Sequence, residues 1–286
     1  AESSLMTHDR WMPRGVHRVP IHFGHGVRGN LYFKDGAPTP MPVVVWLHPL
    51  SYHSGYNEGY GVQGTTVYQR LAENGFAVIA YDQCGFGLRL LEGRDFYKNH
   101  PRWSKLGRMV MDARAAVSFA VEGRGAAKSA IPEFDTKRVF LLGYSSGALT
   151  AMYAGALDDR VAGVACFSGW TPLRNARNAR ATGGNRRFWE QHALQPRLGL
   201  FDGRESEMPF DYDDVLGLVL PKPCLVVTPK RDRFADFSAV VEVIDKVRSA
   251  KPRIAKGSFA WLAPDVTNRF QADQHQEFIN WTKTLE

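Results

Sequence analysis

The chain has 286 residues, of which 44% are hydrophobic and 23% are charged. This length suits one compact domain over 1–286, and the average composition is too polar for a bundle of membrane helices. No stretch approaches the roughly 20 apolar residues that span a bilayer. The formal charge of +7 favours acidic partners in general. No basic helix or aromatic and basic module accompanies it, so we expect no nucleic-acid partner.

The first four residues include neither an initiator Met nor the apolar core of a signal peptide. The chain is therefore expected to be either a processed mature form or a trimmed chain. We favour export, which predicts a secreted or periplasmic protein. The sequence indicates no oligomeric state.

Short apolar runs alternate with amphipathic stretches, a pattern typical of parallel sheets built through helical crossovers. Residues 15–20 and 21–33 are expected to form antiparallel edge strands at the start of the sheet. Five apolar runs suit strands buried on both faces, namely 43–47, 76–81, 139–142, 161–167 and 224–228. Helical spacing of apolar residues predicts a crossover helix over 106–121 and a closing helix over 271–285. The fold class is thus α/β, with a mostly parallel central sheet flanked by helices.

Two connections are longer than a crossover requires, and long ordered loops usually carry function. One spans about 84–104. The other, at about 170–220, is expected to form a lid inserted before the penultimate strand, and it contains a run of arginines from Arg174 to Arg187. We interpret this run as a solvated surface segment, with selection of an anionic substrate such as a uronate ester as the alternative.

The motif G-x-S-x-G occurs at 143–147, between an apolar strand and a stretch with helical character. In this strand, turn and helix context the motif predicts a nucleophilic serine, Ser145. The turn is sharp, so the residues two before and two after the serine must lack bulk. The helix N-terminus beneath the hydroxyl favours negative charge. This motif indicates a serine hydrolase.

The loop after the strand at 43–47 is a candidate part of the oxyanion hole, and its sequence reads His48, Pro49, Leu50. In a serine hydrolase of this type, one backbone N–H from this loop and one from the residue after the nucleophile hold the oxyanion. Pro49 has no N–H. Leu50 and Ser146 are therefore the predicted donors, and His48 is interpreted as a residue that holds the loop.

Three segments resemble the α/β-hydrolase superfamily: 80–87, 143–147, and 209–213 leading into 220–227. They look closest to its dienelactone-hydrolase-like and carbohydrate-esterase branch, which includes acetyl xylan and glucuronoyl esterases. The resemblance runs from about residue 40 to the end of the chain. It implies the α/β-hydrolase fold and an ester substrate, and it implies no metal or organic cofactor.

The resemblance also implies a catalytic acid after the strand that follows the lid, where Asp232 lies. Its role would be to accept the N–H of the catalytic histidine. A salt bridge with Arg231 or Arg233 is the alternative for Asp232, and Asp236 is a second candidate acid.

The base is where the sequence departs from the family pattern. A histidine is expected in the loop after the last strand, at about 258–262, but Asn268 stands there. Chain order selects His275, the histidine that follows Asp232 in sequence. His192 in the lid, and His48 or His53 in the oxyanion loop, are the alternative bases.

These observations predict an esterase that works through an acyl-enzyme, with a catalytic triad of Ser145, Asp232 and His275. Its substrate would be a small-molecule or carbohydrate ester. Two alternatives remain open: a peptidase or C–C hydrolase on the same fold, and a non-catalytic binding protein that lacks a functional base.

Overall fold

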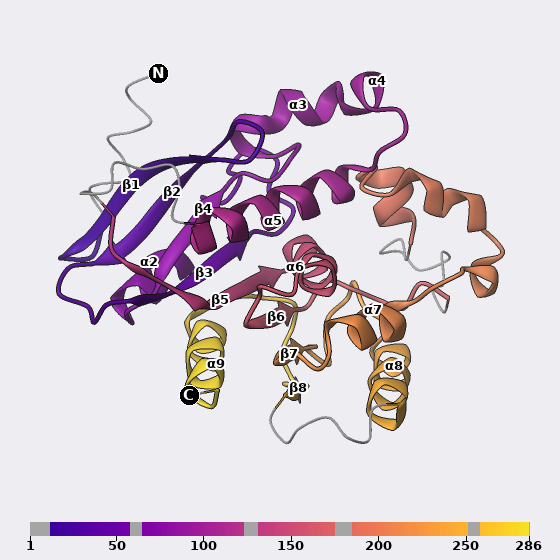
Figure 1. The fold of residues 1–286 in the computed structure, drawn as a ribbon. Helices are drawn as coiled ribbons and strands as arrows, with labels where there is room; N and C mark the ends of the chain where they lie inside the picture. The colour runs from indigo at the N-terminus through magenta and orange to yellow at the C-terminus, as the bar shows by residue number, and fades with distance from the viewer. Residues whose placement is uncertain (1–11, 58–64, 123–130, 175–184, 251–257, 286) are drawn as a thin grey trace.

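The computed structural model describes residues 12–57, 65–122, 131–174, 185–250 and 258–285. Its centre is an eight-stranded sheet with the order β1-β2-β4-β3-β5-β6-β7-β8 (Figure 1). Strand β2 runs antiparallel to both β1 and β4, and the strands from β4 onward in this order are parallel. The strands are β1 (Val16–Phe23), β2 (Val27–Lys34), β3 (Met41–Leu47), β4 (Ala77–Tyr81), β5 (Phe134–Tyr144), β6 (Gly163–Phe167), β7 (Cys224–Val227) and β8 (Phe259–Leu262).

The predicted boundary between the first two strands is wrong. The chain turns at residues 24–26, not at 20–21, because Gly24 and Gly26 adopt φ angles of 53° and 77° that favour glycine. Pro20 lies inside β1, opposite Asn30 of β2. Because β1 is at the edge of the sheet, the missing N–H of a proline is tolerated there.

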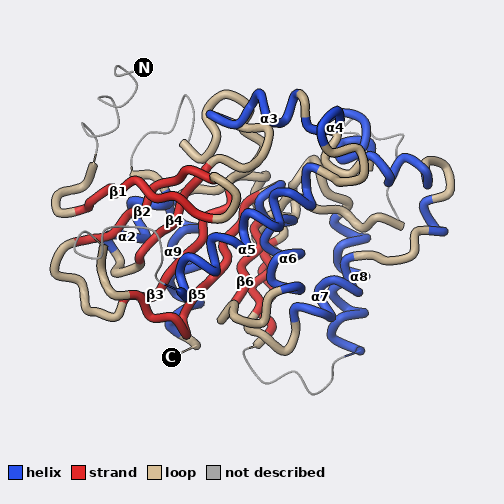
Figure 2. The backbone as a smooth tube through the Cα atoms, turned by 45° about the horizontal axis from the view of Figure 1, so that its top comes forward, coloured by secondary structure: helices blue, strands red, loops and turns tan. Residues whose placement is uncertain are grey.

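Helices cover both faces of the sheet, as Figure 2 shows. Helices α2 and α9 pack on one face, and α5, α6, α7 and α8 pack on the other. Alternate residues of β3 divide between the two cores, with Val43, Val45 and Leu47 in one and Val44 and Trp46 in the other. The helices are α2 (Val67–Glu73), α5 (Lys105–Glu122), α6 (Ser146–Leu157), α7 (Tyr212–Val219), α8 (Phe237–Ala250) and α9 (Ala272–Lys283).

Both long connections carry short helices. The first holds α3 (Leu90–Arg94) and α4 (Phe96–Asn99). The described part of the lid, between β6 and β7, holds a π-helical turn at Arg187–Gln191, 3₁₀ turns at Pro196–Phe201 and Glu205–Glu207, and then α7. Tyr97 joins the two connections, because its hydroxyl donates a hydrogen bond of 2.6 Å to the carbonyl of Ala193.

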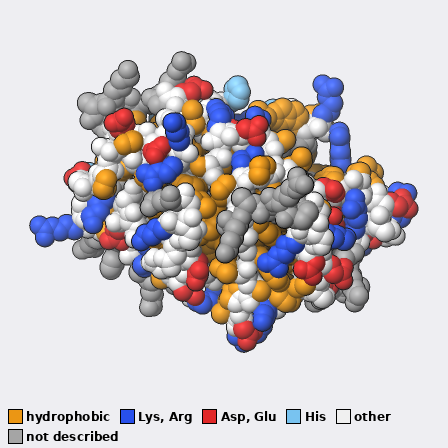
Figure 3. All heavy atoms as spheres, turned by 60° about the horizontal axis from the view of Figure 1, so that its bottom comes forward, with side chains coloured by type: hydrophobic (Ala, Val, Ile, Leu, Met, Phe, Trp, Pro, Cys, Tyr) orange, Lys and Arg blue, Asp and Glu red, His pale blue; other side chains and the backbone are white. Residues whose placement is uncertain are grey.

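Charge is mixed on the face that Figure 3 shows, where Lys and Arg side chains are interspersed with Asp and Glu. Hydrophobic side chains gather toward the middle of this face. Within the described ranges, no helix combines the length and the apolar character needed to cross a membrane.

Candidate active site

Ser145 lies at the turn between β5 and α6, with φ 56° and ψ −120°. These angles are strained for a residue other than glycine and are held by the neighbouring chain. The Ser145 N–H donates to the carbonyl of Phe167 at the end of β6, at 2.9 Å. The turn predicted from the sequence is therefore present.

Glycines on either side let the strand and the helix approach each other. A Cβ atom on Gly143 would lie 2.1 Å from the Gly147 carbonyl oxygen, and one on Gly147 would lie 1.9 Å from the Leu47 carbonyl oxygen. On the adjacent strand end, a Cβ atom on Gly169 would lie 2.2 Å from the Cα of Ser145. Backbone therefore surrounds the serine at distances that only glycine permits.

A cavity of about 700 Å³ opens over Ser145 at the carboxyl ends of the strands. This end of the sheet is where ligands bind in open α/β folds. The loops after β3, β5, β7 and β8 contribute to the cavity, and the lid closes one side. Its walls are formed by Pro49, Leu50, Tyr144, Ser145, Arg187, Gln191, His192, Arg233, Phe234 and Asn268.

The predicted oxyanion donors lie next to this cavity. Leu50 lines it, and Ser146 begins α6 directly after the nucleophile. Within the described part of the chain, the backbone N–H groups of Leu50 and Ser146 donate no hydrogen bond. Both are available to an oxygen that carries developing negative charge.

Asp232 is buried after β7, and its partner is Asn268. The Asn268 side-chain amide donates to one Asp232 carboxylate oxygen at 3.2 Å, and its own oxygen accepts from the Tyr144 hydroxyl at 2.6 Å. Burial and the charge of Asp232 raise the pKa of Tyr144 to about 12, so its hydroxyl is a proton donor at neutral pH. Asn268 therefore occupies the place between the carboxylate and the cavity that a triad gives to histidine.

The structure does not bring His275 to this site. Its ring is buried in α9, and neither ring nitrogen has a hydrogen-bond partner among the described residues. It packs on Phe270, whose ring also stacks on Tyr144. Burial, followed by the charge of Arg70, lowers the pKa of His275 to about 4. These surroundings are those of a neutral core residue.

His48 holds the oxyanion loop, as interpreted from the sequence. One ring nitrogen lies 2.7 Å from the Pro49 carbonyl, and the other accepts the Gln83 backbone N–H at 2.9 Å. Both nitrogens are thus engaged, and burial lowers the pKa of His48 to about 4. The imidazole has no free lone pair for a substrate or for Ser145.

His192 lies on the wall of the Ser145 cavity, directly after the π-helical turn. Its Nδ1 lies 2.7 Å from the Tyr52 hydroxyl, which leaves Nε2 without a partner in the described residues. Burial lowers its pKa, with further contributions from the charges of Arg187 and Lys105. It is neutral at pH 7 and able to accept a proton.

The second candidate acid, Asp236, precedes α8. One carboxylate oxygen accepts from the Ser238 hydroxyl at 2.7 Å and from the Ala239 N–H at 3.4 Å. These contacts are typical of a helix N-cap. They do not place Asp236 in the cavity.

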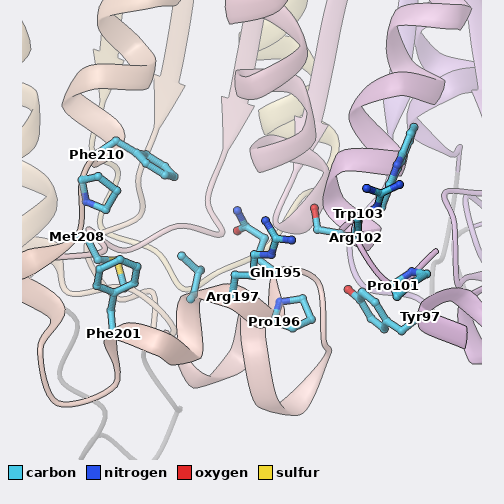
Figure 4. A pocket seen from close by; sticks show the side chains of 13 residues that line it. Tyr97, Pro101, Arg102, Trp103, Gln195, Pro196, Arg197, Phe201, Met208 and Phe210 are labelled. Carbon is cyan, nitrogen blue, oxygen red and sulfur yellow. The ribbon is translucent and has the colours of Figure 1, made fainter.

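A separate cavity of about 330 Å³ lies between the start of α5 and the lid (Figure 4). Its walls are mainly aromatic and apolar, with Tyr97, Trp103, Phe201 and Phe210 among them. It contains neither Ser145 nor Asp232. Across the described ranges, no three His, Cys, Asp or Glu side chains group closely enough to hold a metal ion.

Sequence reasoning missed Tyr52 as a partner of His192, and it did not single out Phe234 in the cavity wall. Of the predicted arginine run, Arg187 faces the cavity, while Arg186 pairs with Asp202 and Glu190. Arg177 and Arg180 lie outside the described residues. The spacing of the run carried no signal that separates Arg186 from Arg187, because the π-helical turn that begins at Arg187 does not follow the periodicity of an α-helix.

Comparison with known proteins agrees with this architecture. The family described as "Serine aminopeptidase, S33" matches residues 43–215, more than half of the chain. No curated protein sequence matches.

Solved structures resemble the chain in fold. A glucuronoyl esterase from Solibacter usitatus aligns with a TM-score of 0.67 and 18% identity, over 94% of this chain and 82% of that one. A promiscuous CE15 esterase from a marine bacterial metagenome gives a TM-score of 0.65 and 14% identity, over 94% and 80%. An esterase from Pyrococcus furiosus gives 0.57 and 18%, over 94% and 90%. The predicted α/β-hydrolase fold is confirmed, and the chain belongs to the serine aminopeptidase S33 family of α/β-hydrolases.

Proposed function

We propose that this protein is a serine hydrolase that cleaves carboxylic esters through an acyl-enzyme. The observation that carries the proposal is the strained Ser145 at a cavity that also offers two unengaged backbone N–H groups. The Ser145 Oγ would attack the ester carbonyl carbon, and Leu50 and Ser146 would hold the resulting oxyanion. The alcohol then leaves with a proton, and water releases the acid from Ser145.

The base in this proposal is His192, supplied by the lid. Among the histidines of the described residues, it is the one that lines the cavity with Ser145. The tautomer that donates from Nδ1 to Tyr52 leaves the Nε2 lone pair for the proton of Ser145. Tyr52 would then fix the ring as a carboxylate does in a triad, without adding a negative charge.

An ester fits this cavity better than the N-terminus of a peptide. An aminopeptidase must accommodate a substrate ammonium group, which favours a nearby carboxylate. Among the described residues, the cavity wall instead carries Arg187 and Arg233 and no Asp or Glu. Two guanidinium groups repel an ammonium ion, so the family name does not by itself set the substrate.

A carbohydrate ester is the substrate class that the structural likeness favours. The aligned glucuronoyl esterase covers most of this chain. The cavity volume of about 700 Å³ lies in the range of small-molecule sites. We extend the proposal to esters of sugars or sugar acids for these two reasons.

A non-catalytic binding protein is the rival reading, and Asn268 is the observation that favours it. Asn268 binds Asp232 where a triad has its histidine, and its amide cannot accept the proton of Ser145 near neutral pH. The two readings differ in one outcome: only the hydrolase acylates Ser145.

The test compares His192→Ala with His275→Ala in single-turnover acylation by an activated aryl ester. His192→Ala is expected to slow acylation by roughly 10²- to 10⁴-fold, the range for loss of a general base, and added imidazole should restore part of the rate. His275→Ala is the matched control, because it removes an imidazole that lines no part of the cavity.

The pH profile gives an independent readout. The base acts when neutral, so acylation should rise with pH and level off with a midpoint below the ordinary histidine value of about 6.5, because burial and Arg187 lower the pKa of His192. Loss of acylation in His275→Ala alone would contradict the assignment.

A further inference from the structure

Two arginine side chains flank the same aromatic ring in the wall of the Ser145 cavity. The guanidinium carbon of Arg187 lies 4.2 Å from the ring centroid of Phe234, and that of Arg233 lies 4.6 Å from it. All three residues line the cavity. Arg187 is only 7% exposed, so its charge is largely withdrawn from bulk water.

Neither guanidinium forms an ion pair with a carboxylate in the part of the chain that the structure describes. Asp232 is the neighbouring acid, but one of its oxygens binds Asn268 and the Phe234 N–H, and the other has no hydrogen-bond partner. The contrast is with Arg89, whose side chain is 12% exposed and which binds both Glu92 and Asp112.

Burial of Arg187 disfavours its charge, and the exposed Arg233 adds repulsion, while the charge of Asp232 offsets only part of this cost without forming an ion pair. The cost falls when an anion in the cavity binds to these guanidinium groups. A guanidinium presents a planar pair of N–H donors that fits a carboxylate in a bidentate manner. The arrangement therefore suits a carboxylate that enters the cavity together with the reacting ester.

We propose that Arg187 and Arg233 bind a free carboxylate of the substrate, so that the ester cleaved at Ser145 is a half-ester of an acid or an ester of a hydroxy acid. This inference rests on the proposed function. It narrows the substrate class from esters in general to anionic esters, and it assigns Arg187 and Arg233 as residues that determine specificity.

The first experiment uses two matched pairs of esters, which place the carboxylate on either side of the scissile bond. On the acyl side, the mono-p-nitrophenyl ester of glutarate is compared with p-nitrophenyl valerate. On the alcohol side, 3-acetoxybenzoate is compared with phenyl acetate. Measurement at pH 8 keeps His192 neutral in every variant, even where loss of Arg187 raises its pKa.

In one of the two pairs, kcat/KM is expected to be at least about tenfold higher for the anionic ester. Arg187→Gln and Arg233→Gln should each lower that preference by roughly 10- to 100-fold, the range for a lost charge-assisted hydrogen bond.

Arg186→Gln is the matched control, because Arg186 pairs with Asp202 and Glu190 and lines no part of the cavity. Its preference should equal that of wild type. Equal rates within both pairs in wild type, or an equal loss for both esters in Arg187→Gln, would overturn the inference.

The second experiment does not depend on turnover. Calorimetry on Ser145→Ala should detect binding of glutarate or 3-hydroxybenzoate, and this binding should be lost in Ser145→Ala/Arg187→Gln. Such a result supports the carboxylate site even if no ester is hydrolysed. Failure of both acids to bind, while neutral esters are still cleaved by wild type, overturns the inference and leaves the proposed function intact. Tighter binding of inorganic phosphate than of either acid overturns the assignment to a carboxylate.

Discussion

Because Asn268 stands beside Asp232, another residue of the site must supply the base in the proposed reaction. Asn268 contacts Asp232 and lines the cavity, yet a side-chain amide does not accept a proton near neutral pH. The hydrogen bond from Tyr144 fixes its orientation, since the amide oxygen accepts and the amide nitrogen donates. In the proposed reaction, proton transfer from Ser145 must therefore use another group, and His192 is the residue we propose.

Asn268→His is predicted to supply a base from another part of the cavity wall. In a His192→Ala background, the new imidazole lies beside Asp232, which can hold it in the productive tautomer. Single-turnover acylation of this double variant should exceed that of His192→Ala alone by at least about tenfold. Asn268→Gln in the same background is the control, because it changes the side chain without adding a base. Equal rates in the two double variants would count against Asn268 as the vacant base position.

Only part of the candidate site could be predicted from the sequence. The sequence located Ser145, Asp232 and the departure at Asn268, because each follows a recognisable apolar strand. It placed the base at His275, since chain order was the available criterion. The contact between Tyr52 and His192 joins residues 140 positions apart, through a lid whose turns have no regular periodicity. No local pattern predicts such a pair.

At the scale of elements, the turn from β5 to α6 holds the proposed nucleophile and also constrains the fold. The strand end, the helix start and the β3 loop meet at Gly143 and Gly147, where each glycine approaches backbone atoms. The sequence predicted this turn because the G-x-S-x-G motif places glycines where a side chain would collide with neighbouring backbone. The predicted turn between the first two strands, after residue 20, was misplaced, because β1 continues through Pro20, which an edge strand tolerates.

Gly147→Ala is predicted to destabilise the fold by about 3 kcal/mol or more, because its Cβ atom would overlap the Leu47 carbonyl and force backbone apart. Gly217→Ala in α7 is the control. A Cβ atom there meets nothing within 4 Å, and alanine favours helix by up to about 1 kcal/mol. Urea unfolding measures both. A Gly147→Ala variant as stable as wild type would show that the close approach does not constrain the turn.

At the scale of the molecule, the sheet order brings the functional loops together. The carboxyl ends of strands β3, β5, β7 and β8 lie on one side of the sheet, and the lid after β6 lies next to them (Figure 1). Solved structures that share only 14% to 18% identity with this chain have a similar fold. The loops and the lid carry the residues that distinguish this site, which is why the fold was predictable from strand and helix patterns and the base was not.

Covalent labelling is the most direct test of whether Ser145 is an activated nucleophile. A fluorophosphonate reacts with a serine that is activated by a base and an oxyanion hole, and intact mass spectrometry counts the adducts. We expect one adduct on the wild-type protein, mapped to the peptide that contains Ser145, and none on Ser145→Ala. Labelling of His192→Ala should be slower than that of His275→Ala. A folded wild-type protein that gains no adduct, or an adduct that persists in Ser145→Ala, would contradict this expectation.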